Sequence, residues 1–215
     1  MTVPLNHEGK GSEAPSSRRN TDATGPLLAG PPLVARHVEL KPVTRSDYDF
    51  LYNLSASREP STRWRYSGGF PNPEAFVQEL WSSVLTQFVI VERAKGRPIG
   101  HLMAHRPDLR NSFAHVAATL IPEYLGTGWA LGESWVLFMN CLFSLWNFRK
   151  LYAEVVGYNY DKLRSGAGTF YVEEGCLREH EYQFGRYWDV HILAFYRGPW
   201  ERICSEVLPN LLEER

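Results

Sequence analysis

The most apolar segment of the chain, residues 129–146, limits its fold more than any other feature. It carries four polar side chains, Glu133, Ser134, Asn140 and Ser144, among Trp, Leu, Phe and Val residues. A helix needs about 20 apolar residues to cross a bilayer, whereas this segment is shorter and polar on one side. We therefore expect a half-buried helix within a folded domain, and no membrane partner.

Composition places the chain among ordinary globular proteins. Hydrophobic residues make up 44% of its 215 residues and aromatic residues 13%, which is enough for one sizeable core. Lys and Arg total 23 against 24 Asp and Glu, so the net charge is -1. A dedicated nucleic-acid binder usually has a basic excess, so we expect no nucleic-acid partner.

The cysteines are few and do not form a metal motif. Cys141, Cys176 and Cys204 are widely spaced, and none belongs to a CxxC pair. This pattern predicts neither a disulfide framework nor a zinc site, so we expect no metal. Because the first residues also lack the apolar run of a secretory signal, the expected location is the reducing cytoplasm.

Residues 1–33 differ in composition from the rest of the chain. They are rich in Gly, Pro, Ser, Thr and Asn and nearly devoid of aromatic residues. Such a segment cannot bury enough apolar surface to offset the entropy lost on ordering. We therefore predict a flexible tail over 1–33, followed by a single domain over 34–215.

Hydrophobic periodicity predicts a mixed α/β fold for this domain. Alternation predicts strands, and the turn residues between the three predicted strands of residues 87–121 indicate an antiparallel meander. The predicted strands are 36–43, 87–93, 99–105, 113–121, 151–156, 174–183 and 187–196. Helical spacing and capping residues predict helices over 48–54, 73–84, 129–146, 159–165 and 201–212.

A glycine-containing loop, Leu125 to Ala130, joins a predicted strand to the long helix. Glycines let the backbone approach a ligand closely, and the unpaired N–H groups at a helix start bind phosphate oxygens. A diphosphate, as in coenzyme A or a nucleotide, fits this arrangement. Taken alone, the same Gly-Thr-Gly sequence is equally typical of a plain turn, and it matches neither a P-loop nor a dinucleotide fingerprint.

The wider sequence around this loop resembles the GNAT superfamily of N-acetyltransferases, whose diphosphate motif is Q/R-x-x-G-x-G/A. Gly128 and Ala130 match its last two fixed positions, whereas Leu125 replaces the Gln or Arg. Residues 122–130, PEYLGTGWA, look like the P-E-Y-W-G-K-G-Y-A pattern of the RimJ/RimL-type branch, which acetylates the N-termini of ribosomal proteins.

Motifs further along the chain follow the same branch in order and spacing. They are Asn159, Tyr171, the Glu-Gly pair at 174–175, and the segment GRYWD at 185–189. The resemblance implies a GNAT-like, mostly antiparallel sheet flanked by helices, with one pair of strands splayed apart at the acyl-CoA site. It also implies acetyl-CoA as the acyl donor.

The resemblance further implies which residues contact coenzyme A. The pantetheine arm would pair with strand backbone, and the diphosphate would bind the loop amides. Lys162 replaces the usual Ser of the branch, and it either reaches a phosphate or is an ordinary exposed helical Lys. The implied contact residues are Leu120, Ile121, Leu125, Gly126, Thr127, Gly128, Trp129, Ala130, Asn159 and Lys162.

Direct transfer to an amine requires a base and, for the departing thiolate, an acid. His115 stands where the branch often has Glu, and an unperturbed imidazole has a pKa of about 6.5, which suits a base. The alternative is a structural strand residue. The usual Tyr seven residues after Asn159 is absent because Gly166 stands there, so Tyr160 is the candidate acid.

The loop between the first two helices usually forms a wall of the acceptor site, and here it carries Arg63, Trp64, Arg65 and Tyr66. Positive charge suits an amine acceptor that also bears a carboxylate or phosphate; a solvated loop is the alternative. We expect a small-molecule amine as the acceptor. Other hypotheses are a protein N-terminal or peptide acetyltransferase and a non-catalytic acyl-CoA-binding module. A homodimer is compatible with either enzyme.

Overall fold

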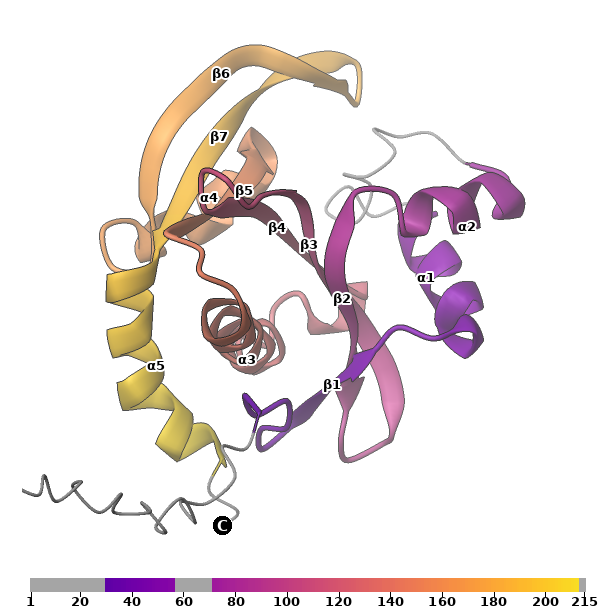
Figure 1. Cartoon of the computed structure of the whole chain (residues 1–215). Coiled ribbons are helices and arrows are strands. Elements are labelled where there is room, and N and C mark those ends of the chain that lie inside the picture. The colour runs from indigo at the N-terminus through magenta and orange to yellow at the C-terminus, as the bar shows by residue number, and fades with distance from the viewer. Residues whose placement is uncertain (1–29, 57–70, 213–215) are drawn as a thin grey trace, which may run out of the picture. The chain divides into compact units, whose positions relative to one another are not determined.

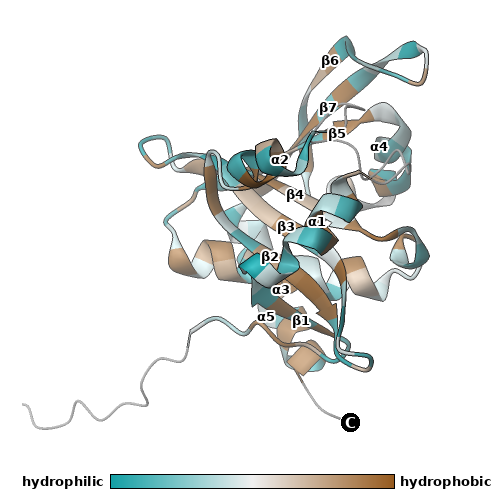
Figure 2. Ribbon diagram, turned by 90° about the vertical axis from the view of Figure 1, so that its right-hand side faces the viewer, coloured by the Kyte–Doolittle hydropathy of each residue, from teal (hydrophilic) through white to brown (hydrophobic). Residues whose placement is uncertain are grey.

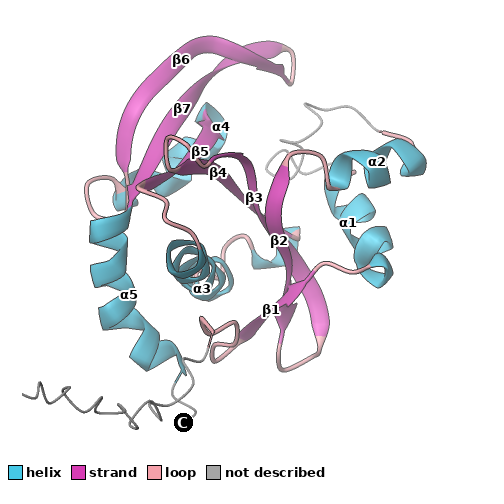
Figure 3. Ribbon diagram, viewed as in Figure 1, coloured by secondary structure: helices cyan, strands magenta, loops and turns pink. Residues whose placement is uncertain are grey.

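The structure, a computed structural model, describes residues 30–56 and 71–212. The tail predicted over 1–33 lies almost wholly outside these residues, so the domain boundary at residue 34 stays a prediction. The described strands are β1 (Val38–Pro42), β2 (Val84–Glu92), β3 (Arg97–Asp108), β4 (Phe113–Leu120), β5 (Lys150–Val156), β6 (Val172–Gln183) and β7 (Arg186–Tyr196). The described helices are α1 (Tyr48–Ser55), α2 (Pro73–Leu80), α3 (Trp129–Leu145), α4 (Gly157–Leu163) and α5 (Arg197–Leu212), as Figures 1 and 3 show.

The order of elements predicted from periodicity is confirmed, and the main error lies at the end of α2. Helical spacing predicted that this helix reaches Val84, but it ends at Leu80, and Val84 opens β2 opposite His105. Ser83 has a φ of 56°, which takes the chain out of the helical conformation. Trp81 is therefore not a core residue: it is 47% exposed, and its indole N–H donates to the Tyr48 hydroxyl over 3.0 Å.

The seven strands within residues 30–56 and 71–212 form one sheet in the order β1-β2-β3-β4-β5-β7-β6. All neighbouring strands are antiparallel except β4 and β5, which run parallel. Their pairing covers only Phe113 to His115 opposite Lys150 to Tyr152. Beyond this point β4 continues beside β3 and β5 continues beside β7, so the two strands part. The predicted mixed α/β sheet with one splayed strand pair is confirmed.

The two faces of the sheet are covered differently. One core lies between the sheet and α3 and α5, and it includes Leu137, Phe138 and Trp200. A smaller core lies between α1, α2 and the first strands of the sheet, and it includes Leu51 and Phe76. Hydrophobic and hydrophilic residues alternate along α2 in Figure 2, as a helix with one buried side requires.

Among the described helices, none is both long enough and apolar enough to cross a membrane.

Candidate acyl-CoA site

The loop before α3 presents backbone N–H groups to solvent. Gly126, Thr127 and Gly128 are exposed, and no heavy atom lies within 4 Å of a Cβ built on either glycine. Within the described part of the chain, the N–H groups of Gly126, Gly128, Ala130 and Leu131 have no protein acceptor. The first turn of α3 carries no acidic side chain. The loop is therefore an open site of the kind that binds phosphate oxygens.

Gly128 gives this loop its shape. Its φ of 72° and ψ of -49° form a γ-turn, closed by a 2.8 Å hydrogen bond from the Trp129 N–H to the Thr127 carbonyl. This turn is strained for residues with a Cβ, and glycine adopts it without steric cost. The turn uses the Trp129 N–H internally, so Gly126, Gly128 and Ala130 are the loop residues whose amides remain for a ligand.

Tyr124 and Trp129 hold the loop against the sheet. The buried Tyr124 ring lies edge-on to Trp129, with centroids 5.6 Å apart. Its hydroxyl donates to Glu92 Oε2 over 2.7 Å and accepts from Arg97 over 2.8 Å. The hydrogen bond from Tyr124 holds the pKa of Glu92 below its usual range. These contacts fix the loop before any ligand arrives.

The parted strands expose backbone of β4. The Ile121 N–H donates to the Ile99 carbonyl over 2.9 Å, so odd-numbered residues of this strand bond toward β3. Because the direction alternates along an antiparallel strand, Ala118 and Leu120 direct their N–H and C=O groups into the gap beside β5. This arrangement suits the predicted role of Leu120 in pairing with a pantetheine arm. The backbone of Ile121 differs from that of Leu120. Its N–H donates to Ile99 and its carbonyl accepts from the Tyr124 N–H, so both groups already have partners.

The remaining two implied coenzyme A contacts, Asn159 and Lys162, lie on α4. This helix follows β5, whereas the loop before α3 follows β4. Since the carboxyl ends of parallel strands meet at one edge of a sheet, α4 and the loop lie on the two sides of the same gap. Neither side chain has a hydrogen bond to another described residue, so both are available to a ligand.

His115 lies where the gap opens, as the last β4 residue paired with β5. Its side chain is mostly buried, with 18% exposed. Its Nδ1 lies 3.3 Å from Glu154 Oε1 and 3.2 Å from an Arg106 nitrogen, and Arg106 also donates to Glu154 over 2.8 Å. The imidazole ring packs beside Tyr152, with centroids 5.6 Å apart. The face that carries His115 is the one that α1 and α2 cover further along the sheet.

The charges around His115 decide what each group can do. The hydrogen bond with His115, followed by the charge of Arg106, lowers the pKa of Glu154 to about 2 against the opposing effect of burial. A carboxylate with so low a pKa is a poor proton acceptor. The Arg106 guanidinium can only donate, so Nδ1 of His115 accepts from Arg106 in one tautomer and donates to Glu154 in the other. Only the second tautomer leaves the Nε2 lone pair to accept a proton.

Sequence reasoning missed Arg106 and Glu154. Glu154 lies two residues after Tyr152, so alternation along the predicted strand puts both side chains on one face. The sequence contains this signal. Arg106 has a φ of 45° within an irregular stretch of β3 between His105 and Asp108, and this backbone turns its side chain toward β5. Pro107 in this stretch is a sequence signal for a bulge, because proline cannot donate to the strand ladder, but it does not predict where the Arg106 side chain points.

Tyr160 and His115 are not brought together. The Tyr160 hydroxyl donates to Glu173 on β6, and its ring stacks on His191 of β7 at 3.7 Å. In the order of strands, β5 and β7 separate Glu173 from β4. The bond to Glu173 raises the pKa of Tyr160 to about 12. This placement gives no support to Tyr160 as the acid for a thiolate in the gap.

A second charged network lies on the same face as His115. Glu174 accepts from Lys150 Nζ over 2.8 Å, from the Tyr152 hydroxyl over 2.8 Å, and from the Tyr196 hydroxyl. Burial raises the pKa of Glu174, but these donors outweigh it and lower the pKa to about 2. The predicted acceptor residues, Arg63, Trp64, Arg65 and Tyr66, lie outside the described residues.

Comparison with known proteins identifies the architecture. No family model and no curated protein matches the sequence. Among solved structures, spermidine N-acetyltransferase from Vibrio cholerae in complex with CoA and spermine is similar over 77% of this chain and 98% of its own, with 22% identity and a TM-score of 0.65. A chimera of the spermidine N-acetyltransferase SpeG from Vibrio cholerae and hSSAT is similar over 78% and 99%, with 21% identity and a TM-score of 0.65. The described chain therefore has the GNAT fold of these N-acetyltransferases.

Proposed function

We propose that the protein is an acetyl-CoA-dependent N-acetyltransferase that transfers the acyl group directly to the primary amine of a small metabolite. The observation that carries this proposal is the parting of β4 from β5, with unpaired amides at the start of α3 at its open end. A thioester donor needs both features, because its extended pantetheine arm must lie between the two strands and its diphosphate must bind backbone amides.

In this proposal the diphosphate binds the amides of Gly126, Gly128 and Ala130, and the pantetheine arm pairs with Ala118 and Leu120. The thioester then lies near His115, where β4 and β5 separate. His115 accepts a proton from the attacking amine at Nε2, and Glu154 stabilises the resulting imidazolium through Nδ1. Positioning of the two reactants supplies much of the remaining rate.

The acceptor is proposed to be a small amine. The arginines predicted to bind an anionic group of the acceptor, Arg63 and Arg65, lie outside the described residues. The spermine in the comparison structure makes polyamines one class to test. The motif resemblance to the RimJ/RimL-type branch makes N-terminal peptides another.

Release of free coenzyme A tests the proposal directly. The full chain is incubated with acetyl-CoA and polyamines, amino acids, phosphorylated amines or N-terminal peptides, and thiol release is followed. We expect turnover with a small amine and none without an acceptor. Calorimetry with coenzyme A separates the outcomes: binding without turnover on any amine would indicate a binding module, whereas no binding would refute the proposed site.

A further inference from the structure

A bulge near the start of β6 brings three different donor groups onto one face of the sheet. Glu173 pairs with Leu193 of β7, but Gly175 pairs with the next residue, Ile192, so Glu174 is an extra residue. In a regular strand, side chains three residues apart point to opposite faces. With the extra residue, Glu173 and Cys176 point to the same face.

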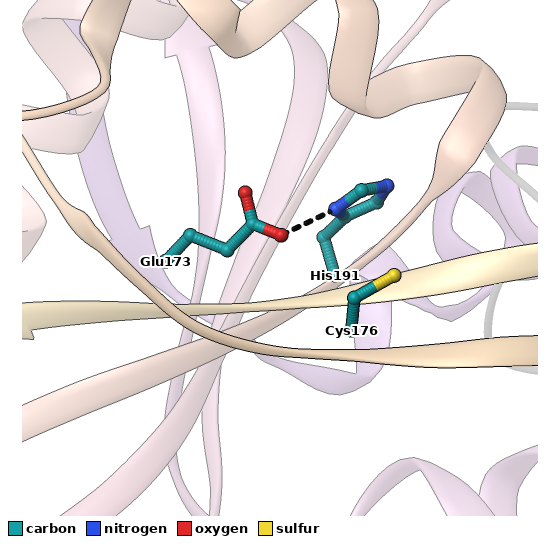
Figure 4. Close-up of side chains that lie close together, drawn as sticks. All are labelled: Glu173, Cys176 and His191. Atoms are coloured by element: carbon teal, nitrogen blue, oxygen red, sulfur yellow. Dashed lines mark hydrogen bonds and ion pairs between the residues drawn. The ribbon is translucent and has the colours of Figure 1, made fainter.

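His191 completes the group as the cross-strand partner of Cys176. Its Nδ1 lies 2.9 Å from Glu173 Oε1, and the donor atoms of Glu173, Cys176 and His191 all lie within 4.8 Å of one another. Figure 4 shows the three side chains on the same side of the hairpin. Oxygen, nitrogen and sulfur are the three donor types that zinc combines in proteins.

We propose that Glu173, Cys176 and His191 bind one divalent transition-metal ion of the zinc type, with water in the fourth position. In a tetrahedral site with bonds of about 2.0–2.3 Å, ligand atoms are about 3.3–3.8 Å apart. The present limit of 4.8 Å exceeds that spacing by about 1 Å, which the Glu173 and Cys176 side chains must close by rotation when a metal binds. The sequence contains no metal motif because the three residues converge only through the bulge and the strand pairing.

Neighbouring groups already orient two of the three ligands. The Tyr160 hydroxyl donates to Glu173 Oε2, and the Tyr160 ring lies parallel to the His191 ring within 10°. Partners of this kind hold ligands in the geometry that a metal requires. The side chains of Glu173 and His191 are 33% and 16% exposed, which leaves an entry path from solvent.

The charges balance once a metal is bound. The Cys176 thiol releases its proton to solvent and binds as thiolate, and together with the Glu173 carboxylate it neutralises a dication. His191 binds through Nδ1 as a neutral ring with its hydrogen on Nε2, so metal bonds replace the Glu173–His191 hydrogen bond. The nearby Asp189 carboxylate, 3.8 Å from Sγ, is already paired with Arg178 at 2.5 Å.

The test uses the full chain without a histidine tag, titrated with Zn²⁺ by calorimetry and with Co²⁺ by absorption spectroscopy. Cobalt replaces zinc in such sites and reports a thiolate ligand by charge-transfer absorption. We expect one equivalent of metal and this absorption in the unsubstituted chain. Cys176→Ser should abolish the absorption, and His191→Gln should weaken binding at least about tenfold.

Two matched variants serve as controls. Glu174→Gln changes the adjacent glutamate, which points to the other face, and His180→Gln changes an exposed histidine of β6. Both should retain one equivalent and the charge-transfer absorption. X-ray absorption of the zinc-loaded chain gives an independent reading, expected to show one sulfur ligand. Failure of the unsubstituted chain to bind either metal, or absorption that survives Cys176→Ser, would overturn the proposal.

Discussion

Two histidine–glutamate pairs lie on opposite faces of the same sheet, and they differ in their third partner. On β4 and β5, His115 and Glu154 are joined by Arg106. On β6 and β7, His191 and Glu173 are joined by Cys176. The first pair lies where two strands part, and the second lies within a continuous hairpin.

The third partner decides the chemistry. A guanidinium beside Glu154 keeps the carboxylate ionised and adds positive charge, which opposes binding of a metal cation and leaves the imidazole to move protons. A thiol beside Glu173 adds a soft donor and no positive charge, which favours a transition metal. In the two proposals above, the same two residue types thus serve proton transfer in one place and metal binding in the other.

The largest expected effect is on the proton-transfer pair. His115→Ala should lower kcat by about 100-fold or more, because the attacking amine loses its base. Steady-state coenzyme A release across pH measures this effect, with His180→Gln as the control histidine. An unchanged kcat at every pH would remove His115 from the mechanism. Metal binding at β6 and β7 should be unaffected.

Glu154→Gln should have a smaller effect, a decrease in kcat of about tenfold, because Glu154 acts through His115. With a pKa of about 2, Glu154 remains ionised through any practical assay range, so its own titration does not shape the profile. Its removal destabilises the imidazolium, and the acid limb of kcat against pH should move to lower pH. A purely structural role would lower kcat without moving that limb.

Gly128→Ala should weaken coenzyme A binding by about 5- to 30-fold, because a Cβ strains the γ-turn by about 1–2 kcal/mol. Gly132→Ala is the matched control, since Gly132 lies in α3 with nothing within 4 Å of its added Cβ. It should stabilise the helix slightly. Calorimetry with coenzyme A measures both variants. Equal affinities would show that the turn is not part of the donor site.

Glu174→Gln should lower the free energy of unfolding by about 1–2 kcal/mol near neutral pH, after allowance for solvent screening. The folded pKa of about 2 lies below the ordinary value of 4.5, so this stability is present above pH 4.5 and is lost as pH falls toward 2. Urea unfolding at pH 7 and pH 3 measures it. The difference between variant and unsubstituted chain should shrink at pH 3; a constant difference would contradict the ion-pair origin.

Much of the fold, and the loop that forms one part of the candidate site, were predictable from local patterns. The loop at Gly126 and Gly128 was found because glycine spacing before a helix is a local signal, and the strands were found by alternation. The end of α2 was missed because Trp81 and Val84 continue the helical spacing. Arg106 was missed as a partner of His115 because it reaches the imidazole from an irregular backbone stretch of β3.

The sequence alone determined the order of elements, the sheet with its long apolar helix, and the glycine turn before it, because each depends on residues close together in the chain. Tertiary structure alone decided which charged groups meet. One extra residue in β6 puts Cys176 on the same face as Glu173, beside His191, while Glu174 faces the other side, beside Lys150. Side-chain direction alternates with every residue of a strand, so such a choice depends on register, which only the assembled sheet fixes.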